Sequence, residues 1–573
     1  MNASLLLYPH LSTRAYLLSL VASLGRKKKK KMCAAVLPSP LLGLPAEILD
    51  SVASHLSNRD RKSLRLTCRV FGQRVLLQIG RVFLSANPRN IEVFRAIADH
   101  EIYRKKVAEL IWDDARLDPP PEPPRAYRCE HRAHHIEPFW QQWYQDICDR
   151  NSEGALSKQD IETPNRAARA SWIAAQPPIE DMWNHYKELY GQQQEIMKTS
   201  DDALALRYGL ERFPSLTQIT LTPAAHGVPF KPLYQTPMIR ALPYGFNYPI
   251  PRGWRCSEPS SRMRMTEWSS DEIDEREKNR WRGYRIIIWT LARMDHHITD
   301  FVVDVGLLNT GLNAHMFNQP CSEQDDLVTV LLKPGFRRLD LALILSGQTD
   351  LGFPAFRNRQ LHGALSQASD LEHISLRTNM TYDLEFDDWI DDGEEQPFIP
   401  LLSIFPVERW PRLRHWGLSG FSVRMDDLVG LLSLLPDTLR SVELSFLKFQ
   451  EGHGSHRDLL FHLRDNLGWR GRDPADRPKV SMGWQEDNVF RGDGYAVWVD
   501  EEVNKFLYGD GENPFLETNP EIRDGIGIQK CYFDPEFERP NVDTFELMRR
   551  GFLKNEMIIL GVKHTVQSFL GEE

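Results

Sequence analysis

Residues 44–71 carry apolar side chains at helical spacing. Pro45 suits the first turn of a helix, where no intrahelical N–H is needed, and Asn58 and Asp60 offer caps for a second helix. The apolar positions of the two predicted helices are Ile48, Leu49, Val52 and Leu56, followed by Leu64, Cys68 and Phe71. So short a module buries too little surface to be stable alone. Its remaining apolar face therefore needs the rest of the chain or another protein.

A second pattern recurs between residues 107 and 444. Each unit has an aliphatic or aromatic residue, two others, a second such residue, one other, and a third. The last two apolar residues alternate as in a strand with one inward face, and the first sets the turn into the strand. The units span residues 107–112, 216–221, 298–303, 336–341, 371–376, 413–418 and 439–444.

Leucines at helical spacing lie between several of these units, for example Leu428, Leu431 and Leu435 before the last one. A helix followed by a strand, over and over, predicts a parallel sheet with crossover helices. The pattern resembles an irregular leucine-rich-repeat solenoid, whose usual period is roughly 20–29 residues. The spacing here is longer and less even, and the Asn or Cys ladder of regular repeats is not evident. A non-repeat α/β domain that reuses the same strand signal is the alternative.

The N-terminal helical pattern also matches a known motif. Leu44-Pro45-x-Glu47-Ile48-Leu49, with Asp60 further on and the ending Cys68-Arg69-x-Phe71, resembles the F-box. An ordinary pair of amphipathic core helices is the alternative. The resemblance implies a three-helix module that binds a Skp-family adaptor in a cullin–RING ubiquitin ligase. The residues assigned to adaptor binding and to the packing of the module are Leu44, Pro45, Ile48, Leu49, Val52, Leu56, Leu64, Cys68 and Phe71; the sequence does not divide the two roles among them.

An F-box followed by leucine-rich-like repeats is the layout of one major class of F-box proteins. Residues 212–227 and 236–254 are also similar to filamentous-fungal F-box proteins, most of which are uncharacterised. The expected fold class is α/β, with a three-helix F-box at residues 41–86 after a disordered leader at 1–40. An irregular leucine-rich-repeat-like solenoid follows at 87–470, with long insertions near 113–210 and 222–295. Residues 471–573 form a C-terminal extension that packs on or caps the solenoid.

Composition narrows the function classes. The 573 residues carry a net charge of −9, too mild to imply a nucleic-acid or membrane partner. Seven scattered cysteines argue against a disulfide framework and fit a reducing compartment, so we expect a cytoplasmic or nuclear protein. The apolar run 15–24 precedes the basic run 26–31, the reverse of a secretory signal. The basic run is either an import or anionic-surface patch or part of a leader ahead of a true start at Met32.

Candidate chemistry is sparse. No GxSxG elbow, P-loop or HExxH occurs, so no catalytic residue and no cofactor is predicted. Cys129, His131, His134, His135 and Cys148 lie near one another in sequence but lack the paired spacing of structural zinc sites, so no metal is predicted.

Two functions remain. In the first, the chain is the substrate receptor of an SCF-type ubiquitin ligase, and its repeat region holds a target protein. In the second, it is an adaptor-bound scaffold whose partner is not degraded. Turnover of the partner separates the two.

Overall fold

The computed structural model describes residues 44–122, 136–157, 166–254, 267–268, 272–345, 352–381, 398–484, 494–516, 522, 525–540, 557–559 and 562–564. The chain forms two compact units, Met1–Gly80 and Arg81–Glu573. The expected leader lies outside the described residues. The first strand of the sheet begins at Arg81, within the range assigned above to the helical module.

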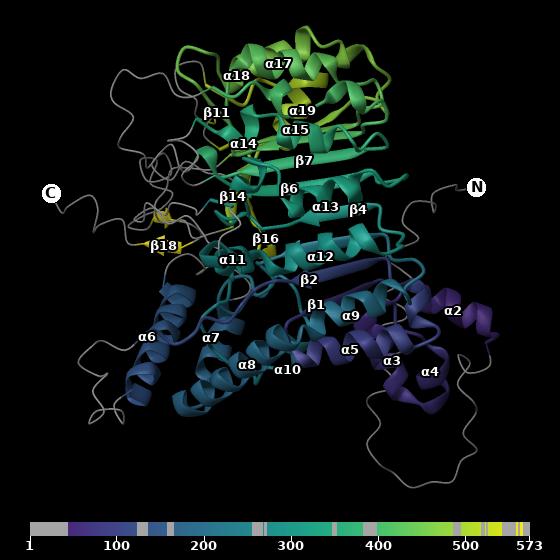
Figure 1. The fold of residues 1–573 in the computed structure, drawn as a ribbon, viewed down its shortest axis with the longest axis vertical. Helices are drawn as coiled ribbons and strands as arrows, with labels where there is room; N and C mark the ends of the chain where they lie inside the picture. The colour runs from purple at the N-terminus through teal and green to yellow at the C-terminus, as the bar shows by residue number, and fades with distance from the viewer. Residues whose placement is uncertain are drawn as a thin grey trace, which may run out of the picture. The chain divides into compact units, whose positions relative to one another are not determined.

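The first unit contains three helices, α2 (Ala46–Ser54), α3 (Asn58–Thr67) and α4 (Arg69–Arg74). The second unit is built on a parallel sheet (Figure 1). Its strands are β1 (Arg81–Ser85), β2 (Glu109–Asp113), β3 (Gln218–Thr222), β4 (Asp300–Val303), β6 (Arg338–Ile344), β7 (His373–Thr378), β8 (His415–Ser419), β10 (Ser441–Ser445) and β12 (Lys479–Ser481), with the short β5 (Leu312–Asn313) beside β6.

Each strand on this path pairs in parallel with the next one along the chain. All seven predicted units form strands of this sheet, so the prediction of a parallel α/β sheet is confirmed. The strands β1 and β12 were not predicted: Lys479–Ser481 carries a single apolar residue, too little for a periodic signal.

The same backbone turn recurs from unit to unit. The carbonyl of Ala108 accepts hydrogen bonds from the N–H groups of Thr217 and Gln218, both at 3.0 Å. The carbonyls that make the equivalent pair of bonds to the next unit belong to Thr217, Thr299, Arg337, Glu372 and Arg414. The first apolar residue of each predicted unit, Leu371 for example, is buried beneath this turn. The repeat is therefore one of backbone geometry as well as of side-chain pattern.

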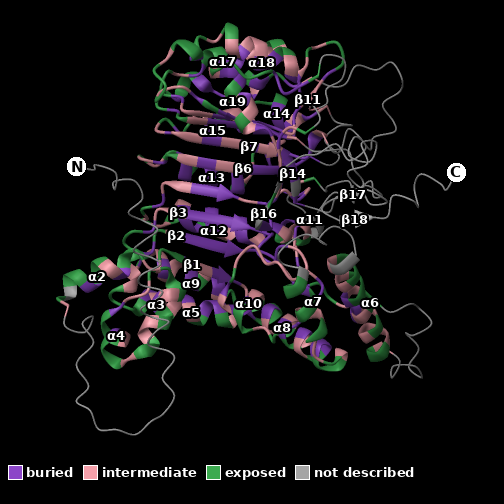
Figure 2. Cartoon of the chain, turned by 180° about the vertical axis from the view of Figure 1, so that it is seen from behind, coloured by how far each residue is buried: buried purple, intermediate pink, exposed green. Residues whose placement is uncertain are grey.

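Helices connect the strands along one face of the sheet. They include α5 (Pro88–Asp99), α9 (Asp201–Leu210), α12 (Arg282–Arg293), α13 (Ser322–Leu331), α14 (Pro354–Arg357), α15 (Gln360–Leu365), α17 (Met425–Leu434) and α18 (His456–Asp465). Because strand order never reverses and crossovers are right-handed, successive helices fall on the same side. Side-chain burial agrees: Leu339 and Leu341 of β6 are buried, whereas Arg338 and Asp340 are partly exposed. Figure 2 shows the strands from the side opposite to Figure 1.

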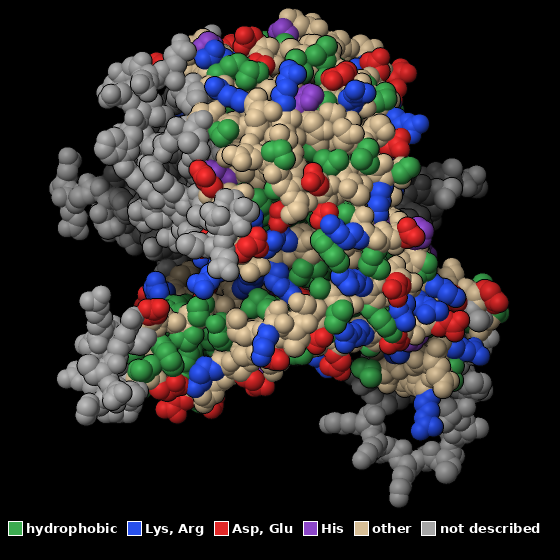
Figure 3. Space-filling model, in the orientation of Figure 1, with side chains coloured by type: hydrophobic (Ala, Val, Ile, Leu, Met, Phe, Trp, Pro, Cys, Tyr) green, Lys and Arg blue, Asp and Glu red, His purple; other side chains and the backbone are tan. Residues whose placement is uncertain are grey.

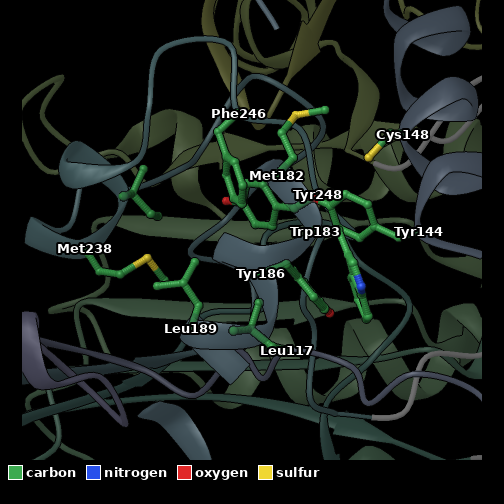
Figure 4. Close-up of a cluster of buried hydrophobic side chains, with 11 residues drawn as sticks. Leu117, Tyr144, Cys148, Met182, Trp183, Tyr186, Leu189, Met238, Phe246 and Tyr248 are labelled. Atoms are coloured by element: carbon green, nitrogen blue, oxygen red, sulfur yellow. The ribbon is translucent and has the colours of Figure 1, made fainter. Parts of the chain in front are cut away.

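A helical insertion lies between β2 and α9. It contains α6 (Ile136–Ser157), α7 (Arg166–Ala174) and α8 (Ile179–Thr199), and a second insertion after β3 adds α10 (Pro237–Ala241) and α11 (Glu272–Lys278). Hydrophobic side chains gather on the surface near α6 and α7 (Figure 3). The two insertions share a buried cluster rich in aromatic side chains (Figure 4), formed by Leu117, Tyr144, Cys148, Met182, Trp183, Tyr186, Leu189, Met238, Ile239, Phe246 and Tyr248.

The C-terminal residues pack on the sheet. Helix α19 (Asp500–Tyr508) contacts α18 and β12. The strands β13 (Gly483–Trp484), β14 (Tyr495–Trp498), β15 (Ile528–Cys531) and β16 (Asp534–Pro540) form a small antiparallel sheet. After β15, the Tyr532 hydroxyl donates to the Asp304 carboxylate at 2.7 Å, and Lys231 pairs with Asp534. Shorter pairs are formed by β9 (Ser422–Val423) with β11 (Lys448–Phe449), and by β17 (Met557–Ile559) with β18 (Val562–His564).

Candidate protein-interaction site

The three helices of the first unit are held by local caps and by ties to the segment that follows them. Pro45 is the N-cap of α2, one residue before the first-turn position expected for it. The cap of α3 is Ser57, whose hydroxyl accepts from the Asp60 N–H at 3.2 Å, so Asn58 and Asp60 are not the caps. Asn58 instead exchanges two hydrogen bonds with the backbone of Gln78, at 2.6 and 2.8 Å.

Two arginines of α3 bind backbone carbonyls of the same segment. Arg61, which is 5% exposed, donates to the carbonyls of Leu56 at 3.0 Å and Leu76 at 2.7 Å. Arg65 donates to the Val75 carbonyl at 2.6 Å. Burial lowers the pKa of the Arg61 guanidinium, and the nearby Asp50 opposes that shift. These charge-assisted bonds add to the apolar packing of Val75 in holding residues 75–78 against α3.

Helix α2 carries two apolar stripes, one buried and one largely exposed. Leu49 and Ala53 are 2% and 3% exposed and pack with Phe71 and Val75. The second stripe runs through Pro45, Ile48 and Val52, at steps of three and four residues. Pro45 is exposed, Ile48 is 48% exposed, and Val52 is half-buried. The unit therefore uses one stripe for its own core and leaves the other largely in solvent.

The structure thus separates the nine predicted residues. Leu49 and Phe71 are buried in the core of the unit, and Leu64 and Cys68 pack partly buried against it. Leu44, Val52 and Leu56 are half-buried, while Pro45 and Ile48 are exposed. The nine residues therefore divide into those that pack in the core around Leu49 and those that lie at the surface around Ile48.

Two further apolar side chains of this unit are exposed and were missed. Leu66 on α3 is 88% exposed, and Val70 on α4 is 39% exposed. Both lie off the predicted helical stripes. The signal that could have revealed them is an apolar residue at a position where the pattern expects a polar one. They extend the apolar surface of the unit beyond α2.

The second unit offers a long polar row on the sheet face opposite the helices, called the open face below, which is exposed along this row and buried further along the strands. The row takes one residue from each of nine paired strands, near the amino end of the strand: Arg81, Glu109, Gln218, Asp300, Arg338, His373, His415, Ser441 and Lys479. All are exposed or half-buried. Arg81 donates to Glu109 at 2.5 Å, and Gln218 donates to the same carboxylate at 3.1 Å. The row mixes both signs of charge and carries many hydrogen-bonding groups.

At the middle of this face the charges are organised around Asp340. Arg338 donates to its carboxylate at 2.5 Å, and the His373 Nε2 lies 2.8 Å away. Burial raises the pKa of Asp340, but His373 and Arg338 outweigh burial and leave the pKa below its usual value. The His415 ring stacks on His373 with centroids 4.0 Å apart. Burial and the charge of His373 lower the pKa of His415 to about 3, so His415 is neutral near pH 7.

The described residues contain no group of three or more His, Cys, Asp or Glu side chains placed to hold a metal ion. Of the candidate zinc ligands, Cys129, His131, His134 and His135 lie outside the described residues. Cys148 is buried in the aromatic cluster, where burial raises its thiol pKa to about 12. A thiol of this kind is a packing residue and a poor nucleophile.

Comparison with protein-family models gives no match, and comparison with curated proteins gives none either. Among the helices that the structure describes, none has both the length and the apolar character needed to cross a bilayer.

Proposed function

We propose that this chain is an F-box protein, the substrate-recognition subunit of an SCF-type ubiquitin ligase. The first unit binds a Skp-family adaptor, and the second unit holds a target protein. The observation that carries the proposal is the bare Pro45–Ile48 stripe, which lies inside the Leu-Pro-x-Glu-Ile-Leu motif. A small helical unit that leaves such a stripe in water gains free energy when another protein covers it.

The leucine-rich-repeat-like assignment of the second unit is part of the same proposal. It is supported by strands that follow chain order, by the backbone turn repeated from Ala108 to Arg414, and by helices confined to one face. Solenoids of this kind present one extended surface to partners. The mixed charges of the open face favour a protein partner, since no single sign of charge dominates.

In this proposal the chain contributes no catalytic group, because the thioester chemistry belongs to other subunits. Its contribution is to hold the target near the charged conjugating enzyme. Positioning of this kind raises the effective concentration of target lysines without lowering any chemical barrier itself.

The test is adaptor binding by the double variant Leu44→Ala, Pro45→Ala in the full chain. Pro45 is exposed and Leu44 half-buried, so both can contact a partner. We expect co-purification with a recombinant Skp-family adaptor to weaken at least about tenfold, since burying a large aliphatic side chain contributes about 1.5–3 kcal/mol. Leu434→Ala, which truncates a 58% exposed leucine on α17, is the matched control. Adaptor recovery equal to that of the control would remove the docking assignment.

Turnover distinguishes the receptor from the scaffold. Partners found by proximity labelling should persist longer in cells that carry the Leu44→Ala, Pro45→Ala chain than in cells with the unchanged chain. Unchanged half-lives would leave the adaptor-bound scaffold as the function.

A further inference from the structure

A pocket of about 420 Å³ lies between α7 and residues 226–250, in the region where apolar side chains gather near α6 and α7 (Figure 3). Its wall includes Trp172, Phe230 and Tyr244. The Trp172 ring meets the Phe230 ring at 68° with centroids 4.9 Å apart, and the Tyr244 ring lies 6.3 Å from Trp172. Tyr244 is 67% exposed. The volume falls in the usual range for ligand pockets and suits one or two side chains.

Phe230 occupies a position that a phenylalanine does not favour. The Lys231 N–H donates to the Val228 carbonyl at 2.9 Å across a tight turn, with Pro229 second and Phe230 third. The φ of Phe230 is +66°, and turns with a positive φ at the third residue favour glycine or asparagine. A bulky residue in this backbone conformation is strained. The ring that this strain holds in place forms part of the pocket wall.

The floor of the pocket is rigid. Phe246 and Tyr248 line it and also belong to the buried aromatic cluster of Figure 4. Their rings stack with centroids 5.2 Å apart, and the Tyr248 hydroxyl lies 2.7 Å from His226 Nδ1. Prolines 229, 232 and 243 stiffen the rim. A pocket built this way loses little entropy when it is filled.

Charge decides between two kinds of occupant. An aromatic wall can bind a cation through its ring faces, or an uncharged ring by packing. The charged side chain of the lining is Arg240, which is exposed and makes no ion pair with another described residue. Burial lowers the pKa of His226 to about 3, with the charge of Arg252 adding to the effect, so His226 is neutral. An acidic group at the rim is therefore favoured and a cation is not.

We propose that this pocket receives a ring-bearing side chain, aromatic or proline, from an extended segment of the target protein, and that Arg240 pairs with a carboxylate on the same segment. The proposal rests on the receptor function above, because it assigns the target-binding site to this pocket.

The probes are an array of ten-residue peptides with Trp, Phe, Tyr, Pro or Ala at the centre and two Glu or two Lys residues directly after it. They are titrated against the full chain by fluorescence anisotropy. We expect ring-plus-Glu peptides to bind at least about tenfold more tightly than the ring-plus-Lys or Ala-centred ones. Tyr244→Ala should weaken the binding, and Arg240→Glu should reverse the preference from Glu to Lys, which a merely structural role would not do.

Phe230→Gly removes the ring from the pocket wall without disturbing the fold, because glycine adopts the positive φ of this turn without strain. It should bind peptide weakly while its thermal unfolding midpoint stays near that of the unchanged chain. Arg409→Glu, on an exposed arginine of the 3-10 turn Val407–Arg409, is the charge control and should bind as the unchanged chain does.

The proposal is overturned if no ring-plus-Glu peptide binds in preference to its Lys counterpart, or if Arg240→Glu leaves the preference unchanged. Adaptor co-purification is measured on the same variants. If the chain binds the adaptor but no peptide, the pocket assignment alone is removed. If it binds peptide but the double variant Leu44→Ala, Pro45→Ala leaves adaptor binding unchanged, the receptor function alone is removed.

Discussion

Adjacent residues of α2 give a direct test of its two stripes. Ile48 is 48% exposed, and Leu49, the next residue, is 2% exposed. The variants Ile48→Ala and Leu49→Ala remove similar aliphatic groups from the same helical turn. If the two stripes have the roles assigned here, Leu49→Ala affects the stability of the unit and Ile48→Ala affects adaptor binding.

The magnitudes follow from burial. Truncating a buried leucine to alanine costs about 2–5 kcal/mol, because transfer free energy is lost and a cavity remains. Ile48→Ala removes contacts from a side chain that is half in water and gains helix propensity, so its net cost to folding is about 0–0.5 kcal/mol. On docking, the exposed half of Ile48 contributes about 0.7–1.5 kcal/mol, which is roughly a three- to tenfold change in adaptor affinity.

Hydrogen exchange on the full chain measures the stability term, because it reads residues 44–75 separately from the larger unit. A loss of about 2 kcal/mol or more in Leu49→Ala should speed exchange of protected amides in α2 and α3 at least about 30-fold. Ile48→Ala should leave their exchange nearly unchanged. Titration of the adaptor by calorimetry then measures the binding term for Ile48→Ala.

Two results would refute the reasoning. Exchange that accelerates equally in both variants would mean that Ile48 is a core residue in solution. Unchanged exchange together with full adaptor affinity in Ile48→Ala would mean that the exposed stripe is not the contact surface.

Two further predictions concern the larger unit. Burial raises the pKa of Asp113 to about 7, so folding takes up a proton and the free energy of unfolding falls as pH rises from about 3.8 to about 7. Asp113→Asn should flatten this pH dependence by up to about 1.4 kcal/mol per pH unit, as measured by denaturant unfolding across that window. An unchanged slope would contradict the assignment. Gly209→Ala on α9 should lower the thermal unfolding midpoint, because the new Cβ would lie 2.7 Å from Phe94 Cε1, whereas the control Gly191→Ala on α8 meets no atom within 4 Å and should raise stability by about 0.5–1 kcal/mol. Equal shifts in the two glycine variants would show that the α5–α9 contact tolerates the extra carbon.

Much of the fold could be predicted because the signal is local. A strand with one buried face needs alternating apolar residues, and the buried turn before it needs one more, so six residues such as 371–376 identify a unit. Strand β1 carries the same pattern, with Ile79 as the turn residue before Val82 and Leu84, but it escaped because residues 41–86 were assigned to the helical module. The helical insertions were located, but their shared cluster joins residues as distant as Tyr144 and Tyr248, which no local pattern connects.

The sequence by itself determined that residues 44–71 form helices with more apolar surface than they can bury, and that parallel strands and helices alternate after them, since both are set by side-chain periodicity. Only the tertiary structure decided that Leu49 packs inward while Ile48 faces solvent, and that Trp172, Phe230 and Arg240 line one pocket. The physical reason is that periodicity gives the direction of a side chain relative to its own helix or strand, whereas burial depends on which other elements cover that side.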